Sequence, residues 1–257
     1  MTPFRMTLVP LVATALLAGC AGGPGPDERE ARGSDMTTAQ RPSFPFPGGG
    51  RGTSAERMAM YAAVEDNGRT VPAIDPQYLT EEKVRQEVDY YAPYKAGTII
   101  VDPGAKRLYH LGEGDRAMRY AVAVGEAGYG FSGKATVPFT REWPNWTPTR
   151  NMLRREPEKY EEFAAGVPGG LDNPLGARAL YLYRNGRDTL YRIHGTPSPW
   201  TVGHNASSGC IRMFNQDVIH LAEEVETGAQ VVVLDRSESG KWTSAPDVVA
   251  EASTSSE

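Results

Sequence analysis

Short runs of β-branched and aromatic residues, separated by glycine, proline and asparagine, dominate the middle of the 257-residue chain. Such runs, closed by turn-forming residues, are typical of β-strands. The strands predicted in this way are Thr98–Asp102, Lys106–Leu111, Tyr120–Val124, Ala179–Tyr183, Thr189–Ile193 and Gln230–Leu234. Asn185-Gly186 predicts a hairpin between two of them, because this pair tolerates the positive φ of a type I′ turn. The pattern therefore predicts a mainly β domain.

One segment instead has the spacing of an amphipathic helix. Apolar residues recur on one helical face from Val218 to Val225. We place Asn215 as the N-cap of this helix and Gly228 at its C-terminal end. The segment Arg141–Gly176 has neither pattern and is rich in proline and glycine. A long irregular segment inside a domain is often a lid or a binding loop, and we expect one here.

The first residues have the pattern of an export signal. Arg5 precedes an apolar run, Leu8–Ala18, which is too short to span a bilayer as a helix but fits the core of a signal peptide. The run ends in Leu17-Ala18-Gly19-Cys20, which resembles the lipobox of bacterial lipoproteins; the alternative is an ordinary secretory signal with a chance cysteine. We expect cleavage after residue 19, lipidation of Cys20, and a lipid-anchored protein on the periplasmic face, with Ala21 favouring the outer membrane.

Charge and cysteine content narrow the chemistry. The formal net charge of −5, without a basic stripe, argues against nucleic acid as a partner. The chain has two cysteines. If Cys20 carries lipid it cannot form a disulfide, so Cys210 is a solitary thiol in an oxidising compartment. Such a thiol is a liability unless its reactivity is used.

A histidine and this cysteine lie in one dense block of the sequence. His194 ends a predicted strand, and Cys210 follows it by sixteen residues, after a turn rich in glycine and serine. A thiol is a nucleophile as the thiolate, and a neighbouring imidazole can take its proton. Free backbone N–H groups in the turn could stabilise an oxyanion, and Gly209 lets a substrate carbonyl approach closely.

The block resembles the active-site motif of the L,D-transpeptidases with a YkuD-type catalytic domain. The residues that carry the resemblance are His194-Gly195-Thr196 and Ser207-Ser208-Gly209-Cys210-Ile211-Arg212-Met213, supported by Trp146-Thr147-Pro148-Thr149 and Asn173–Leu182. The similarity covers about residues 97–235. It implies a β-sandwich-like domain with mixed sheets, a lid loop, and one helix after the catalytic cysteine.

The resemblance also implies roles for individual residues. Cys210 would be the nucleophile and His194 the general base, with the Gly195 carbonyl orienting the imidazole. The N–H groups of Cys210 and Gly209 would face the oxyanion. The substrate-binding residues would be Arg212, Ser207, Ser208 and Trp200. Ser208 stands where the family commonly has a histidine, which leaves any tuning by that imidazole in doubt.

The implied substrate is the peptidoglycan stem peptide, and no cofactor or metal is implied. The acyl acceptor stays open among a stem amine, water and an amine of another protein. A zinc hydrolase using His194, His204, Cys210 and His220 is a second class, although the spacing matches no usual zinc pattern. A non-catalytic peptidoglycan-binding lipoprotein is a third. We interpret His204 as loop surface and Asp217 as a carboxylate favoured by the helix dipole.

The expected organisation follows from these segments. Residues 1–19 are the signal peptide, and residues 20–57 are a disordered tether, since their glycine and proline content prevents a core. Residues 58–96 are an N-terminal extension that packs on the domain. Residues 97–235 are the catalytic domain, and 236–257 are a flexible tail.

Overall fold

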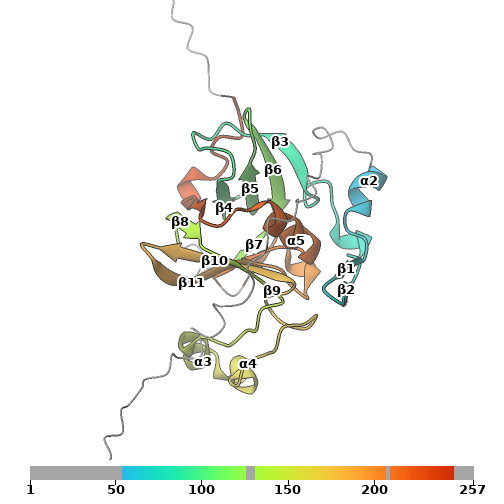
Figure 1. The fold of residues 1–257 in the computed structure, drawn as a ribbon, viewed down its shortest axis with the longest axis vertical. Helices are drawn as coiled ribbons and strands as arrows, with labels where there is room; N and C mark the ends of the chain where they lie inside the picture. The colour runs from blue at the N-terminus through green and yellow to red at the C-terminus, as the bar shows by residue number, and fades with distance from the viewer. Residues whose placement is uncertain (1–53, 126–130, 207–208, 246–257) are drawn as a thin grey trace, which may run out of the picture. The chain divides into compact units, whose positions relative to one another are not determined.

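Residues 54–125, 131–206 and 209–245 are described by the computed structural model (Figure 1). They all belong to the unit Phe46–Glu257. The predicted signal peptide, Cys20, most of the tether, Ser207, Ser208 and the end of the tail lie outside the described residues. Within the described ranges, the helices are too short or too polar to cross a membrane.

Strands form most of the regular structure, as the sequence predicts. Along the sheet they are β12 (Asn205–Ala206), β7 (Ala123–Gly125), β13 (Ile211–Arg212), β11 (Arg187–His194), β10 (Arg178–Arg184), β8 (Gly133–Val137), β14 (Ala229–Val233), β4 (Ile99–Asp102), β5 (Arg107–Leu111), β6 (Arg116–Ala121) and β3 (Gln86–Asp89), with β9 (Thr140–Glu142) also paired to β10. The pairs β11–β13, β12–β7 and β14–β4 are parallel and the others are antiparallel. The mainly β, mixed-sheet prediction is therefore confirmed.

The remaining elements are short. A separate hairpin joins β1 (Val64–Asp66) and β2 (Arg69–Val71). The helices are α2 (Ser54–Ala59), α3 (Arg150–Arg155), α4 (Pro157–Tyr160) and α5 (Asn215–Glu224), and the 3₁₀ turns are η2 (Pro76–Tyr78), η4 (Glu161–Phe163), η5 (Pro199–Thr201) and η6 (Arg236–Glu238). The helix predicted after Cys210 corresponds to α5.

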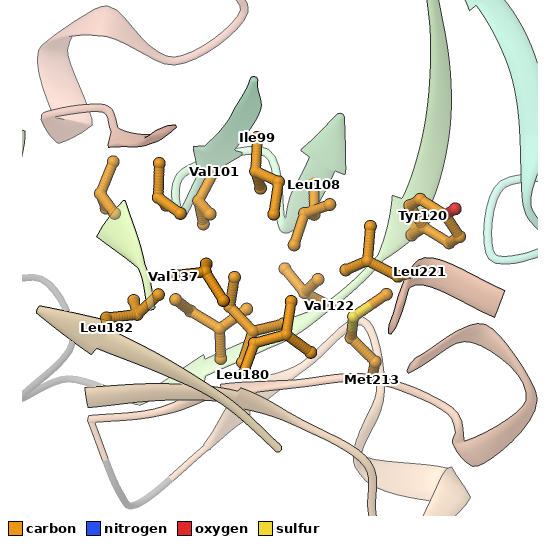
Figure 2. Close-up of a cluster of buried hydrophobic side chains, with 14 of the residues drawn as sticks. Ile99, Val101, Leu108, Tyr120, Val122, Val137, Leu180, Leu182, Met213 and Leu221 are labelled. Atoms are coloured by element: carbon orange, nitrogen blue, oxygen red, sulfur yellow. The ribbon is translucent and has the colours of Figure 1, made fainter. Parts of the chain in front are cut away.

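The sheet closes over a single large apolar cluster, which gives the sandwich-like core. Figure 2 shows Ile99 and Leu108 on one side of this cluster facing Leu180 on the other. Strand alternation divides the residues of β4, because Val101 points into this cluster while Ile100 belongs to a second one on the opposite face. The site strands β11 and β13 lie on the wall of the main cluster.

One predicted strand and the predicted helix differ from the prediction in a way that the apolar pattern does not reveal. The run Tyr120–Val124 is not one strand, because the chain changes sheet neighbours at Val122: β6 pairs with β5, whereas β7 pairs with β13. All five residues from Tyr120 to Val124 are buried. The apolar pattern therefore does not show where one strand ends and the next begins. Helix α5 ends at Glu224 rather than at Gly228, since the buried Val225 turns the chain toward β14.

The N-cap prediction for Asn215 is wrong. Phe214 occupies the N-cap position, and Asn215 is the first helical residue. Its side chain is buried and bonds to the backbone of Ala177 and Thr196 instead of its own helix. Asparagine at the start of a helix often forms hydrogen bonds with backbone groups. The sequence does not show whether those groups belong to its own helix or to a distant segment.

The segment Arg141–Gly176, expected to be irregular, contains α3, α4 and η4. The Thr149 side chain caps α3 by accepting from the Met152 N–H at 3.2 Å, and Pro157 begins α4. These helices have four to six residues, which is too short for an apolar periodicity to emerge.

The segment before β4 packs on the domain through both apolar and charged contacts. Its Tyr61, Ile74 and Val84 share an apolar cluster with Val202 and Phe214. Asp66 of β1 forms a bidentate ion pair with the nearly buried Arg178 of β10, at 2.6 and 2.7 Å. Because Val202 lies between His194 and Cys210 in the sequence, the first contact supports the loop that leads to the cysteine.

Candidate active site

The parallel register of β11 and β13 places two of the predicted site residues, His194 and Arg212, next to each other in the sheet. Ile193 is paired with Ile211, and His194 with Arg212. Both isoleucines point into the main core cluster. Side chains alternate along a strand, so His194 and Arg212 point away from that core. Cys210 lies two residues before Arg212, just before β13 begins.

His194 is held by the backbone of the next residue. Its Nδ1 lies 2.6 Å from the Gly195 carbonyl oxygen. A carbonyl can only accept, so Nδ1 carries the proton and Nε2 keeps a free lone pair. Burial, followed by the positive charge of Arg212, lowers the pKa of His194 to about 3. The imidazole is therefore neutral at physiological pH and able to accept a proton.

Asn215 fixes the turn that contains this carbonyl. Its Oδ1 accepts from Ala177 N at 3.0 Å and from Thr196 N at 3.1 Å, and its Nδ2 donates to Thr196 O at 3.0 Å. A Cβ on Gly195 would lie 2.1 Å from the same Oδ1. Glycine is needed at this position because the amide of Asn215 occupies the space beside it.

The Cys210 thiol is half-buried and lies 3.9 Å from the Leu190 carbonyl oxygen. Burial raises the pKa of the Cys210 thiol, while the Arg192 backbone N–H and the charges of Arg192 and Arg212 act against that rise. With the neutral His194, the resting pair is a thiol and an imidazole.

Arg212 is a partly buried cation that lacks an acidic partner among the described residues. Its Nη1 donates to Thr201 Oγ1 at 3.1 Å, and its Nε is buried without a hydrogen bond. Burial lowers the pKa of this guanidinium. A buried donor without a partner is costly, and a guanidinium binds carboxylates through two parallel hydrogen bonds. The geometry suits an anionic ligand beside His194.

Trp200 precedes Thr201 and is 54% exposed, with its ring centroid 6.5 Å from that of Tyr78. It is an accessible aromatic surface next to the arginine. Trp143, in contrast, is buried and donates from Nε1 to Asp66 Oδ2 at 2.8 Å, which makes it a core residue.

The segment expected to be a lid contains a small aromatic cluster around Tyr160. Tyr160 of α4 is buried and lies close enough to Arg212 to act on its pKa. Its ring packs 6.2 Å from that of Trp146, which in turn lies 6.1 Å from Phe163. The short helices of this segment are thus joined to Trp146 by aromatic contacts.

The other histidines do not join His194 and Cys210. His204 is exposed, and His220 Nδ1 lies 2.8 Å from the Tyr120 hydroxyl oxygen. The described part of the chain contains no group of three or more side chains arranged to hold a metal ion. The four ligands of the zinc alternative are therefore not assembled.

Asp217 does more than face a helix N-terminus. It is fully buried, pairs with Arg85 at 3.2 Å, and accepts from the Tyr61 hydroxyl at 3.2 Å. Burial raises the pKa of Asp217 to about 6. The residue links α5 to the N-terminal extension, which the helix-dipole interpretation missed.

Sequence reasoning also missed the group around Leu190. Asp188 and Arg192 form a bidentate ion pair at 2.7 Å for both bonds, and Leu190 between them has a φ of 64°. The sequence of β11 contains no glycine or proline that would indicate a bulge in this strand. The spacing of these charges is that of a helical pair, so it predicts no contact in a strand.

Comparison with known proteins agrees with this site. The model of the YkuD family, described as the L,D-transpeptidase catalytic domain, matches residues 96–233. That range is more than half of the chain and contains the paired strands with His194 and Cys210. The chain belongs to the YkuD family of L,D-transpeptidase catalytic domains.

Individual relatives share the same region. The chain is 35% identical over 152 residues to "Probable L,D-transpeptidase ErfK/SrfK" of Escherichia coli (strain K12), covering 58% of this chain and 47% of that protein. It is 29% identical over 222 residues to "Probable L,D-transpeptidase YcfS" of the same strain, covering 77% of this chain and 68% of that protein. The chain thus spans about half the length of the first of these relatives.

Among solved structures, a "Probable carnitine operon oxidoreductase caia" from Brucella melitensis is 46% identical to this chain. The similarity covers 62% of this chain and 99% of that one, with a TM-score of 0.43. At that TM-score the similarity carries no argument about function.

Proposed function

We propose that this protein is a cysteine-dependent L,D-transpeptidase that transfers the acyl group of a peptidoglycan stem peptide through a thioester at Cys210. The observation that carries the proposal is the parallel pairing of β11 with β13, which puts His194 opposite Arg212, two residues after Cys210. His194 is neutral, and its Nδ1 is bound to the Gly195 carbonyl. This arrangement leaves Nε2 as the base for the thiol proton.

In the first step, His194 Nε2 takes the proton from Sγ while sulfur attacks the carbonyl of the L-centred third residue of a tetrapeptide stem. The N–H groups of Cys210 and Gly209 stabilise the oxyanion. Collapse breaks the bond to the terminal D-alanine, whose amine takes the proton from the imidazolium. An acyl thioester remains on Cys210.

In the second step, an acceptor amine attacks the thioester and gives a proton to His194. The thiolate leaves and is protonated again by the imidazolium. A stem amine as acceptor gives a 3→3 cross-link. Water instead would give L,D-carboxypeptidase activity, and an amine of another protein would attach that protein to the wall.

Arg212 binds the carboxylate of the departing D-alanine in this proposal. The support is its buried Nε without a hydrogen bond and the lack of an acidic partner among the described residues. Trp200 lies next to it as an aromatic contact for the substrate. Ser207 and Ser208 are proposed substrate contacts from the motif alone, since they lie outside the described residues.

The decisive experiment combines two mass measurements. Muropeptides incubated with the protein should lose D-alanine and form dimers or tripeptides, which identifies the acceptor. Intact-protein mass after carbapenem treatment should show one adduct, because the drug's strained carbonyl presents an electrophile like the acyl donor. Cys210→Ser should show neither result, since a hydroxyl is a far weaker acid than a thiol. An adduct on Cys210→Ser would disprove the nucleophile assignment.

We also propose that the protein is exported and anchored on the periplasmic face through lipid on Cys20. The support is the sequence pattern Leu17-Ala18-Gly19-Cys20 after a short apolar run. More than one acyl chain is needed for firm membrane attachment, and a lipoprotein N-terminus has several. Cys20→Ala should leave the protein unprocessed or release it from membranes. An unchanged N-terminal mass and an unchanged membrane fraction would exclude lipidation.

A further inference from the structure

Strand β11 has a large bulge directly before the site residues. Its Arg192 is paired with Tyr181 of β10, and its Asp188 with Tyr183. Four steps along β11 therefore correspond to two steps along β10. Extra residues in one strand must leave the sheet, and such bulges are frequent next to active sites, where they redirect a side chain.

Side chains of the bulge hold its backbone. Asp188 Oδ1 accepts from Leu190 N at 2.8 Å, and Thr189 Oγ1 donates to Leu182 O at 2.5 Å. Leu190 itself has a φ of 64°, in the left-handed region that a branched residue rarely adopts. Asparagine or glycine would fit this backbone with less strain. A leucine kept in such a conformation suggests a use for its side chain.

The position of Leu190 suggests that use. Its carbonyl oxygen lies 3.9 Å from Cys210 Sγ, and its side chain is 62% exposed, the highest value among the large apolar residues of the described ranges. The neighbouring Arg192 is bound to Asp188 by two hydrogen bonds and lies 4.0 Å over the Tyr181 ring. Because that cation is already paired, the bulge presents an apolar surface to a ligand.

The strand register determines where Leu190 lies relative to Arg212 and Cys210. Arg212 is paired with His194, further along β11, whereas Leu190 precedes Arg192. The two residues therefore lie on opposite sides of Cys210 along the strand. In the proposed function, a donor whose terminal carboxylate binds Arg212 would have its preceding residues on the Leu190 side of Cys210.

We propose that Leu190 is a specificity-determining residue for the acyl donor, packing against the aliphatic side chain of the residue whose carbonyl Cys210 attacks. The inference rests on the proposed function and deepens it. Its ligand class is a peptide with an extended aliphatic side chain at the attacked residue. Removing the apolar contact should weaken binding of that peptide and leave the chemistry of the thiol unchanged.

Leu190→Asn is the test variant, because asparagine tolerates positive φ and the backbone carbonyl near Cys210 remains. Leu190→Met is the conservative counterpart, and Lys106→Asn, at a φ of 55° in the β4–β5 turn, controls for asparagine at a left-handed position. With a tetrapeptide donor, Leu190→Asn should raise KM about tenfold with little change in kcat, since losing one buried leucine contact has about this effect on binding. The iodoacetamide labelling rate of Cys210, measured against pH, should match the wild type.

Leu190→Met should stay within about threefold of the wild type, because volume-conserving apolar exchanges change packing little. The inference would be overturned if the KM of Leu190→Asn stayed within twofold of the wild-type value. It would also be overturned if Leu190→Asn lowered the iodoacetamide labelling rate of Cys210 as well as binding. The same comparison by titration of tetrapeptide onto Cys210→Ala proteins measures binding without turnover. If the wild type does not turn over tetrapeptide but binds it in a way that depends on Leu190, the proposed function is overturned and only the contact between Leu190 and the aliphatic side chain remains.

Discussion

Asn215 and Thr196 are joined through both ends of one side-chain amide, with bonds of 3.1 Å to the Thr196 N–H and 3.0 Å to its carbonyl. The first residue of α5 is thereby tied to the turn that follows His194. Because β13 and α5 follow Cys210 directly, the segment that contains Cys210 is connected to the turn after His194 through this amide as well as through the β11–β13 pairing. Because the Asn215 amide fills the space beside Gly195, a larger side chain at position 195 would displace the backbone there.

Gly195→Ala should therefore damage the site. The added Cβ would lie 2.1 Å from Asn215 Oδ1 and must move the Gly195 carbonyl or the amide. We expect a loss of about 2 kcal/mol in the free energy of unfolding and a carbapenem acylation rate lower by at least tenfold. Gly170→Ala is the matched control, since no atom lies within 4 Å of its Cβ. Urea unfolding and acylation kinetics measure both effects, and equal behaviour of the two variants would contradict the expectation.

The pH dependence of stability should carry a contribution from Asp217. Its pKa is raised from about 4 in the unfolded chain to about 6 in the folded protein. Between these values the folded state holds one more proton than the unfolded state, so this contribution to stability falls as pH rises from 4 to 6 and is constant above.

Asp217→Asn cannot titrate at this position. The stability difference between wild type and variant should therefore change by an amount on the order of 2 kcal/mol across pH 4 to 6. Urea unfolding at several pH values measures it, with the exposed Asp172→Asn as a control. If the curves of wild type and Asp217→Asn run parallel over this window, the raised pKa is disproved.

Alkylation of Cys210 should report a neutral pair. The pKa of His194 is lowered to about 3 and that of the thiol is raised, so neither group is charged at neutral pH. Iodoacetamide should react at a rate that rises with pH, with a midpoint above the value of about 8.5 for an ordinary cysteine. A fast plateau between pH 5 and 7 would instead indicate a thiolate–imidazolium pair.

His194→Ala should lower carbapenem acylation by about 10²–10⁴-fold, the usual effect of losing a general base.

Arg212→Gln should discriminate between donors. A guanidinium that binds the terminal carboxylate contributes to a tetrapeptide but not to its C-terminal amide. We expect KM for the tetrapeptide to rise about tenfold or more, and KM for the amide to change little, because a charge-assisted bond is worth about 1.5–3 kcal/mol. Steady-state release of D-alanine or its amide measures both. Equal losses for the two donors would assign Arg212 a structural role.

The sequence predicts most strands of the core, because short apolar runs are local signals, but it does not predict β8, which contributes Ala135 and Val137 to the main cluster. Strand β5 differs from its predicted range by one residue, Lys106, which has a positive φ in the turn. The pairing of Arg85 with Asp217 joins residues 132 positions apart, and no local pattern encodes it. The conformation of Leu190 depends on a bulge that two strands create together. Long-range polar contacts and register shifts are tertiary properties, so they could not be predicted.

The acceptor for His194 Nδ1 is a main-chain oxygen, and this has a genetic consequence. In a triad with an acidic or amide side chain, one codon change removes the group that orients the base. Here every amino acid at position 195 would supply the same carbonyl, so mutation cannot delete it. A mutation can change the orientation of the imidazole only by moving this backbone. The residues that fix the backbone are chiefly Gly176, Gly195 and Asn215. Tolerated drift, including drift under selection by a covalent drug, should therefore appear around this trio rather than within it.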